Sequence, residues 1–204
     1  MRDGDERDVG SPDAQGTGAH GGVHPLLRHR FSPTSFDETH DVSWQDALLL
    51  VEAARWAPSA GNSQPWMFQP ILRGSPEHEQ LVPLLATSSR TWAASASVLV
   101  LNLGRRFVTA GSDMAYSEFS DYDLGQAVAH MTIQAQSMGL ASRQFRAFDH
   151  GRVTHDFCVP EEWQLRTMTA VGRPVAARPL ARDRRSLSDV LTAAIRRPPN
   201  TSWQ

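Results

Sequence analysis

The sequence predicts one domain of the α+β class, and two observations favour that prediction. The chain has 204 residues and is 40% hydrophobic, which suits a single core better than two. Two patterns typical of amphipathic helices, over 43–57 and 123–139, stand among short apolar runs typical of strands. Because no internal repeat is visible, we expect residues 25–204 to fold as one unit.

Residues 1–24 are expected to form a disordered tail. They hold six glycines and many acidic residues, with only two valines among the large aliphatic residues. Such a segment buries too little apolar surface to offset the entropy lost on ordering. The letters GTGAHG (16–21) match the glycine pattern of dinucleotide-binding folds, but no strand precedes them and no helix follows, so we interpret the match as accidental.

The first helix is predicted over 43–57. Ser43 is the expected N-cap, and Asp46 stands three residues later in a capping-box position. Pro58 is expected to end this helix, because proline cannot continue the backbone hydrogen bonding. Four apolar residues share one predicted face: Trp44, Leu48, Val51 and Ala54.

The second helix is predicted over 123–139, with Asp123 as its N-cap and Gly139 as its end. An apolar stripe follows it: Leu124, Val128, Met131, Ala135 and Met138. Three segments are predicted as strands, 66–72, 97–103 and 165–172. Three shorter helices are predicted: one over 76–86, one that begins after an Asp149 cap, and one from about 187 to 196. Residues 104–120 should form a loop or lid, and residues 141–148 a loop or short strand.

The composition argues against several classes of function. A net charge of −2 and a pI near 6.4 predict neither a nucleic-acid partner nor an electrostatic membrane anchor. The single cysteine, Cys158, cannot form an internal disulfide and is expected to be a small buried residue. No apolar window has the length of a membrane span, and no residue cluster has metal-like spacing, so we expect a cytoplasmic protein without a metal.

The stretch APSAGNSQPW (57–66) joins a predicted helix to a predicted strand and is unusually rich in small and amide-bearing residues. Ala60 and Gly61 would let the backbone approach a flat ring, while Ser59 and Asn62 offer hydrogen-bonding groups. The structural alternative is a capped proline turn in which Asn62 bonds its own backbone.

Five segments, taken in order, resemble the nitroreductase family, the FMN-dependent NAD(P)H oxidoreductases. The likeness covers roughly residues 25–190. The segments are RFSPTSF (30–36), ARWAPSAGNSQPW (54–66), YDLGQAVAHMTIQAQSMGL (122–140), RQFRAFD (143–149) and VGRP (171–174). The resemblance implies a nitroreductase-like fold, with a mixed, mostly antiparallel sheet flanked by helices. It also implies an intertwined homodimer in which the second subunit supplies part of the site.

The resemblance further implies a set of FMN-binding residues. Near the phosphate it places Arg30, Ser32, Arg182 and Arg184, and Thr34 where the family usually has a second Arg or Lys. Arginine suits phosphate because its planar fork binds two oxygens at once. The alternative for 181–186 is a solvated run of charges ahead of a helix. Near the ring and ribityl chain the resemblance places Pro58, Ser59, Ala60, Asn62, Gln64, Arg143 and Gln144.

The implied activity is reduction of small electron-poor acceptors, such as nitroaromatics, quinones or enals, with NADH or NADPH as donor. In the family's ping-pong cycle the donor gives a hydride to the flavin and leaves before the acceptor enters. This chemistry needs no protein nucleophile, and the sequence shows no convincing catalytic triad. The alternative is a non-catalytic FMN-binding or storage protein of the same fold, because Arg146 stands where the family has a small residue and could occlude the nicotinamide.

Overall fold

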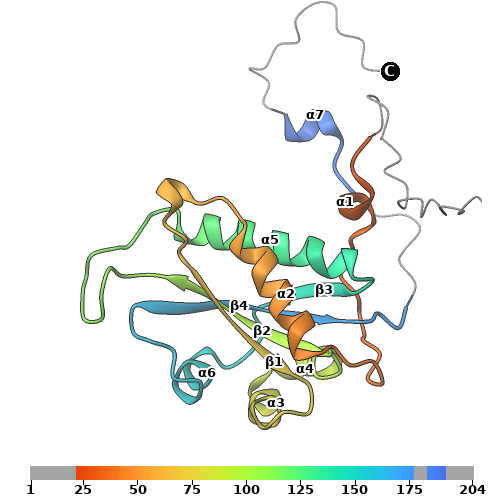
Figure 1. Ribbon diagram of the computed structural model, residues 1–204, viewed down its shortest axis with the longest axis horizontal. Helices are drawn as coiled ribbons and strands as arrows, with labels where there is room; N and C mark the ends of the chain where they lie inside the picture. The colour runs from red at the N-terminus through yellow and green to blue at the C-terminus, as the bar shows by residue number, and fades with distance from the viewer. Residues whose placement is uncertain (1–21, 177–182, 192–204) are drawn as a thin grey trace, which may run out of the picture.

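A four-stranded antiparallel sheet forms the centre of the protein (Figure 1). In this computed structural model, residues 22–176 and 183–191 are described. The strands are β1 (Trp66–Leu72), β2 (Val98–Arg105), β3 (Ala141–Phe145) and β4 (Trp163–Gly172), in the spatial order β1-β2-β4-β3. Each neighbouring pair is antiparallel, so among the described strands the sheet is not mixed. The α+β class is confirmed.

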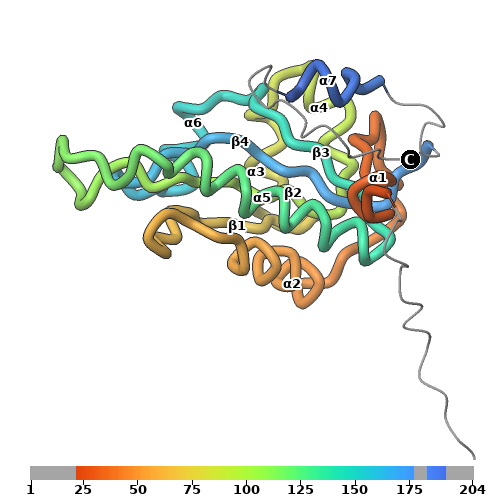
Figure 2. The backbone as a smooth tube through the Cα atoms, turned by 90° about the horizontal axis from the view of Figure 1, so that it is seen from above, coloured from red at the N-terminus to blue at the C-terminus, as the bar shows by residue number. Residues whose placement is uncertain are grey.

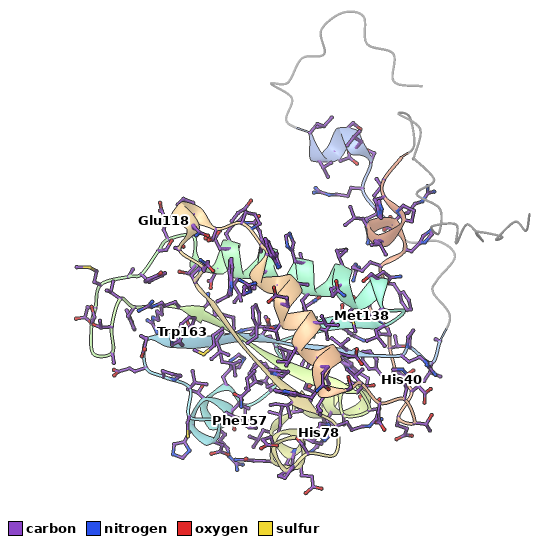
Figure 3. The ribbon with its side chains drawn as sticks, viewed as in Figure 1. His40, His78, Glu118, Met138, Phe157 and Trp163 are labelled. Carbon is purple, nitrogen blue, oxygen red and sulfur yellow. The ribbon has the colours of Figure 1, made fainter. Side chains whose placement is uncertain are left out.

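Helices cover both faces of the sheet and make three layers (Figures 1 and 2). One face carries α2 (Trp44–Arg55) and α5 (Ser120–Ser137); the other carries α3 (Pro76–Leu81), α4 (Thr87–Ala93) and α6 (His150–Asp156). Because strand side chains alternate, Val98 and Val100 pack toward α5, whereas Leu99 and Leu101 pack toward the opposite layer. Met138 and Phe157 extend these two clusters at their margins (Figure 3).

The ends of the described chain lie outside these layers. Helix α1 (Pro25–His29) precedes the domain core, and α7 (Leu187–Val190) projects away from it in Figure 1. The predicted last helix does begin after the cap Ser186, but Leu191 is already extended. Most of the predicted tail, the rest of that last helix and Arg182 lie outside the described residues.

The buried face of α2 differs from the predicted apolar face. Its fully buried residues are Ala47, Leu50 and Ala54, whereas Trp44 and Leu48 are 47% and 45% exposed. The consecutive residues of ALLLV make several faces of this helix apolar, so periodicity alone could not select one. The capping box of Ser43 and Asp46 is present as predicted.

The predicted helix over 76–86 and the predicted burial of Cys158 were both wrong. Residues 76–86 do not form one helix, because Pro83 falls in a 3₁₀ turn (Val82–Leu84) between α3 and the unpredicted α4. Cys158 is exposed rather than buried. It follows the end of α6 with φ of +51°, a left-handed conformation that ends the helix and turns the side chain outward.

No helix in the described parts of the chain has both the length and the apolar character to cross a membrane.

Candidate functional site

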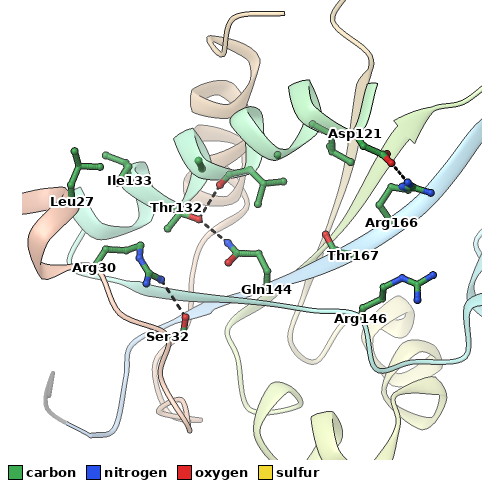
Figure 4. A pocket seen from close by; sticks show the side chains of 14 residues that line it. Leu27, Arg30, Ser32, Asp121, Thr132, Ile133, Gln144, Arg146, Arg166 and Thr167 are labelled. Atoms are coloured by element: carbon green, nitrogen blue, oxygen red, sulfur yellow. Dashed lines mark hydrogen bonds and ion pairs between the residues drawn. The ribbon is translucent and has the colours of Figure 1, made fainter. Parts of the chain in front are cut away.

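A large pocket lies between α5 and the β3–β4 side of the sheet (Figure 4). Its volume is about 920 Å³, near the top of the range typical of small-molecule sites. One wall is the apolar side of α5, and the loop before the domain core closes one end. The described lining residues are Leu27, Arg30, Ser32, Asp121, Leu124, Gly125, Val128, Ala129, Thr132, Ile133, Gln144, Arg146, Arg166 and Thr167.

The sheet beneath this pocket is polar. Asn102 is fully buried, and its Nδ2 donates to Thr167 Oγ1 at 3.0 Å and to Thr169 Oγ1 at 2.8 Å. Gln144 Nε2 donates to Thr132 Oγ1 on α5 at 2.8 Å. Within the described residues, Asn102 Oδ1 has no hydrogen-bond partner. Asn102 itself does not line the pocket, so the polar groups that face a ligand there are those of Thr132, Gln144 and Thr167.

One end of the pocket is formed by Arg30 and Ser32. Helix α1 ends at His29, and the side chains of Arg30 and Ser32 that follow it line the pocket. Arg30 Nη1 donates to Ser32 Oγ at 3.2 Å (Figure 4). A guanidinium beside a hydroxyl is a donor pair that suits an anionic oxygen group.

The other end is formed by Arg146 and Arg166, separated in Figure 4 from Arg30 by Thr132 and Gln144. Arg166 pairs with Asp121 at the start of α5, and its Nη1 donates to Gln164 Oε1 at 2.6 Å. Both arginines lie on the sheet side of the pocket, Arg166 on β4 and Arg146 in the loop that follows β3. This end is therefore also positively charged.

The turn at 58–64 is held in an unusual conformation. Asn62 and Gln64 have φ of +55° and +47°, although neither is glycine, and Gly61 has φ of +57°. Such residues cost free energy and cluster at functional sites. Ser59 Oγ accepts the backbone N–H of Gln64 at 3.0 Å, and Tyr116 Oη donates to the Ser63 carbonyl at 2.8 Å.

Asp123 anchors this turn, and its predicted role as N-cap is wrong. Helix α5 begins at Ser120, so Asp123 lies inside its first turn and is only 2% exposed. Its Oδ2 accepts the backbone N–H of Ala60 at 3.0 Å. A buried acid in the first turn of a helix is also stabilised by the helix dipole, which makes it a suitable anchor.

The structure brings together only some of the predicted site residues. Arg30, Ser32 and Gln144 line the pocket. Arg143 points to the opposite face, where its guanidinium lies 4.1 Å from the Trp92 ring centroid and donates to the Pro33 carbonyl. The side chains of Arg143 and Gln144 point to opposite faces of the sheet because they are neighbours on one strand. Seven other predicted site residues are described but do not line the pocket: Thr34, Pro58, Ser59, Ala60, Asn62, Gln64 and Arg184. Arg182 lies outside the described residues.

The sequence reasoning missed several lining residues, including Thr132, Arg166 and Thr167, and also the buried Asn102 that hydrogen-bonds Thr167. A usable signal was present in β4, where Thr167 and Thr169 alternate with the buried Met168 and Ala170. Polar residues at every second position of an otherwise apolar strand indicate a polar patch on one face. Asn102, alone in an apolar strand, carried the same signal.

The described chain is thus a three-layer α+β domain with a large pocket between a helix and its sheet, a place where small-molecule sites commonly occur. The model of the nitroreductase family matches residues 27–173. The chain therefore belongs to the nitroreductase family, which confirms the family that the five segments predicted.

Individual relatives agree with this assignment. A Streptomyces coelicolor protein, named as an NADH dehydrogenase/NAD(P)H nitroreductase, is 27% identical over 71% of this chain and 79% of its own. The structure of an oxidoreductase containing FMN has a TM-score of 0.70 and 26% identity, covering 86% of this chain and 84% of that one. A Desulfovibrio desulfuricans nitroreductase structure in complex with FMN shares the fold, with a TM-score of 0.69, 23% identity and coverage of 86% and 98%.

Proposed function

We propose that the protein is an FMN-dependent oxidoreductase that uses NADH or NADPH to reduce small electron-poor acceptors. The observation that carries this proposal is the pocket between α5 and the sheet, which is apolar on the helix side, polar on the floor and cationic at the ends. Family membership and the Streptomyces relative support the nicotinamide donor. The FMN-containing neighbour that is 26% identical supports the cofactor.

The residues of the pocket fit FMN. Arg30 and Ser32 would hold the phosphate, because a guanidinium and a hydroxyl both donate to anionic oxygens. Gln144 and Thr132 would hydrogen-bond the polar edge of the ring or the ribityl hydroxyls. Leu124 and Val128 provide an apolar wall for a flat ring.

When bound, FMN would supply the redox chemistry that links the nicotinamide donor to the acceptor. The protein's own part would be to bind and orient the cofactor and the substrates and to exclude water from them. The hydrogen bond between Gln144 and Thr132 fixes the orientation of both side chains, which would lower the entropic cost of ordering the site. No protein nucleophile is needed, and acceptors such as nitroaromatics, quinones and enals fit a ping-pong cycle.

A homodimer is part of this proposal. The outer side of α2 and α5 exposes large apolar residues, including Leu49 at 50% and Trp56 at 73%. A shallow apolar hollow beside Trp56 shares Leu27, Ala129 and Ile133 with the main pocket. Exposed apolar side chains beside an apolar hollow support an interaction surface here. Within one chain the turn 58–64 does not line the pocket, so the proposed contact of this turn with FMN requires the second copy.

Cofactor binding is the direct test. Purified protein should show the visible absorption bands of bound flavin, and NADH or NADPH should bleach them. Arg30→Ala should weaken FMN binding about tenfold but riboflavin binding hardly at all, because riboflavin has no phosphate. Arg28→Ala, in the same segment but not lining the pocket, is the matched control. Apoprotein that ignores added FMN would refute the proposal.

A non-catalytic FMN-binding or storage protein is the second candidate. Arg146 lines the pocket, and a long cationic side chain there could block the nicotinamide. Bound flavin that no nicotinamide donor bleaches, although dithionite does, would favour this candidate over the enzyme.

A further inference from the structure

We propose that Arg146 and Arg166 form an anion-recognition site at the end of the pocket opposite Arg30, and that this site selects an anionic group on the second substrate. The proposal rests on the proposed function and names its substrate class: acceptors or donors that carry a carboxylate or phosphate near the reacting group. Figure 4 shows the two arginines at one end and Arg30 with Ser32 at the other.

The charge of the lining residues favours an anion. The described charged residues of the pocket are three arginines and one aspartate. Asp121 pairs with Arg166 and so offsets only one of the three positive charges. If Arg30 holds the cofactor phosphate, as proposed above, one positive charge remains for a second ligand. That charge is carried by Arg146, which lines the pocket and remains accessible to a ligand.

The backbone around Arg146 is held firmly. The Ala147 carbonyl accepts the Ala86 N–H at 3.1 Å and the Ser89 hydroxyl at 2.5 Å. The Arg146 carbonyl accepts the Phe148 N–H at 3.1 Å and lies 3.2 Å from His150 Nε2. This loop is therefore fixed against the α4 layer, and the position from which the Arg146 side chain extends is set in advance.

The Arg146 side chain itself is exposed and makes no hydrogen bond or ion pair with any described residue. A guanidinium has five N–H donors in a planar fork, and all five are open to a ligand. Arg166 is different, because Asp121 and Gln164 hold it in place while leaving some of its donors unused. One oriented and one adaptable arginine form a suitable pair for a carboxylate or phosphate.

The test compares ligands that differ only in charge. Wild type, Arg146→Gln and Arg166→Gln would be assayed as FMN-loaded protein with 4-nitrobenzoate and with 4-nitrobenzamide. Arg152→Gln is the control, since that arginine is exposed on α6 and does not line the pocket. We expect Arg146→Gln to raise KM for the carboxylate about tenfold and KM for the amide less than about twofold. The selectivity should shrink in high salt.

A second arm identifies the source of the anion. If the donor's phosphates occupy the site, KM for NADPH and NADH should rise in Arg146→Gln. The ratio of the KM values for 4-nitrobenzoate and 4-nitrobenzamide should then be the same in Arg146→Gln as in wild type. A rise in KM for the carboxylate acceptor alone, or for the nicotinamide donors alone, supports an anion site and shows which ligand occupies it. Equal changes in all KM values, or none beyond the Arg152→Gln control, would overturn the proposal.

A direct binding measurement separates this inference from the proposed function. Calorimetric titration of 4-nitrobenzoate and 4-nitrobenzamide into wild-type protein and the variants does not require turnover. If wild type fails to oxidise NAD(P)H but still prefers the carboxylate in an Arg146-dependent manner, the activity is wrong and the anion site stands. If turnover is normal and no preference exists, only the anion site is wrong. Melting temperatures of all variants would show that each one folds.

Discussion

The buried carboxylate of Asp123 accepts a hydrogen bond from the backbone N–H of Ala60, with 3.0 Å between Oδ2 and N. This contact ties the first turn of α5 to the strained turn at 58–64, two segments far apart in the sequence. The turn contains two non-glycine residues at positive φ, Asn62 and Gln64, which costs conformational free energy. The hydrogen bond that holds the neighbouring Ala60 helps to offset this cost.

Asp123→Ala should lower the free energy of unfolding by about 1–3 kcal/mol, since it leaves the Ala60 N–H without its acceptor. The melting temperature should fall by about 2–4 °C for each kcal/mol lost. Thermal unfolding followed by circular dichroism measures this. Asp113→Ala, at an exposed aspartate in the 104–120 loop, should leave the melting temperature unchanged. Equal melting temperatures for both variants would contradict the anchoring role.

Asn62→Ala should weaken FMN binding, because we propose that this side chain lies against the flavin of the second subunit. Alanine is also strained at a φ of +55°, so Asn62→Gly is the companion variant that removes the side chain and relieves the strain. Both should bind FMN more weakly, by about three- to tenfold. Flavin fluorescence titration measures it. Cys158→Ala, at an exposed position, should change neither binding nor turnover, and a larger effect there would refute a purely flavin-borne mechanism.

Stability should fall as the pH drops below neutrality, because His78 is buried in its neutral form. Burial is the main cause that lowers the pKa of His78, with Arg73 adding to it, while the Ala94 backbone and Glu79 act in the opposite direction. Below the unfolded-state pKa of about 6.5 the unfolded chain binds a proton that the folded chain does not. The free energy of unfolding therefore decreases as the pH falls from about 7. This decrease ends once the pH is below the pKa of His78 in the folded state, because both states then bind the proton. Figure 3 shows His78 on the α3 side of the sheet.

His78→Gln removes this titration and should flatten the dependence of stability on pH between about 7 and 5 relative to wild type. Urea unfolding at a series of pH values tests it. His155→Gln is the control, because its side chain is 88% exposed. The same slope in wild type and His78→Gln would contradict the expected contribution.

Trp56→Glu should weaken the proposed homodimer at least about tenfold, because a buried charge at the centre of an interface is costly. Trp56 is 73% exposed in the single chain and adjoins the apolar hollow over α5. Sedimentation velocity at micromolar protein would show dimer for wild type and monomer or unfolded chain for the variant. Thr154→Glu, exposed on α6 in the opposite layer, should remain dimeric. A folded, flavin-bound wild-type monomer would exclude the dimer.

The sequence by itself determined the features that depend on neighbouring residues. The capping box at Ser43, the left-handed stop at Gly139 and the Asp149 cap of α6 all appear as predicted. Such signals act within four residues, so they can be recognised without a fold. The ordered motifs also indicated the family, and Arg30, Ser32 and Gln144 do meet at one pocket.

Only the tertiary structure decided which surfaces face one another. It selected the buried face of α2, turned Arg143 away from the pocket while Gln144 enters it, and converted Asp123 from an expected cap into a buried anchor. It also brought Arg146 and Arg166 to one end of the pocket. These outcomes depend on strand register and on helix packing between distant segments, where a single residue's shift reverses the side that a side chain faces.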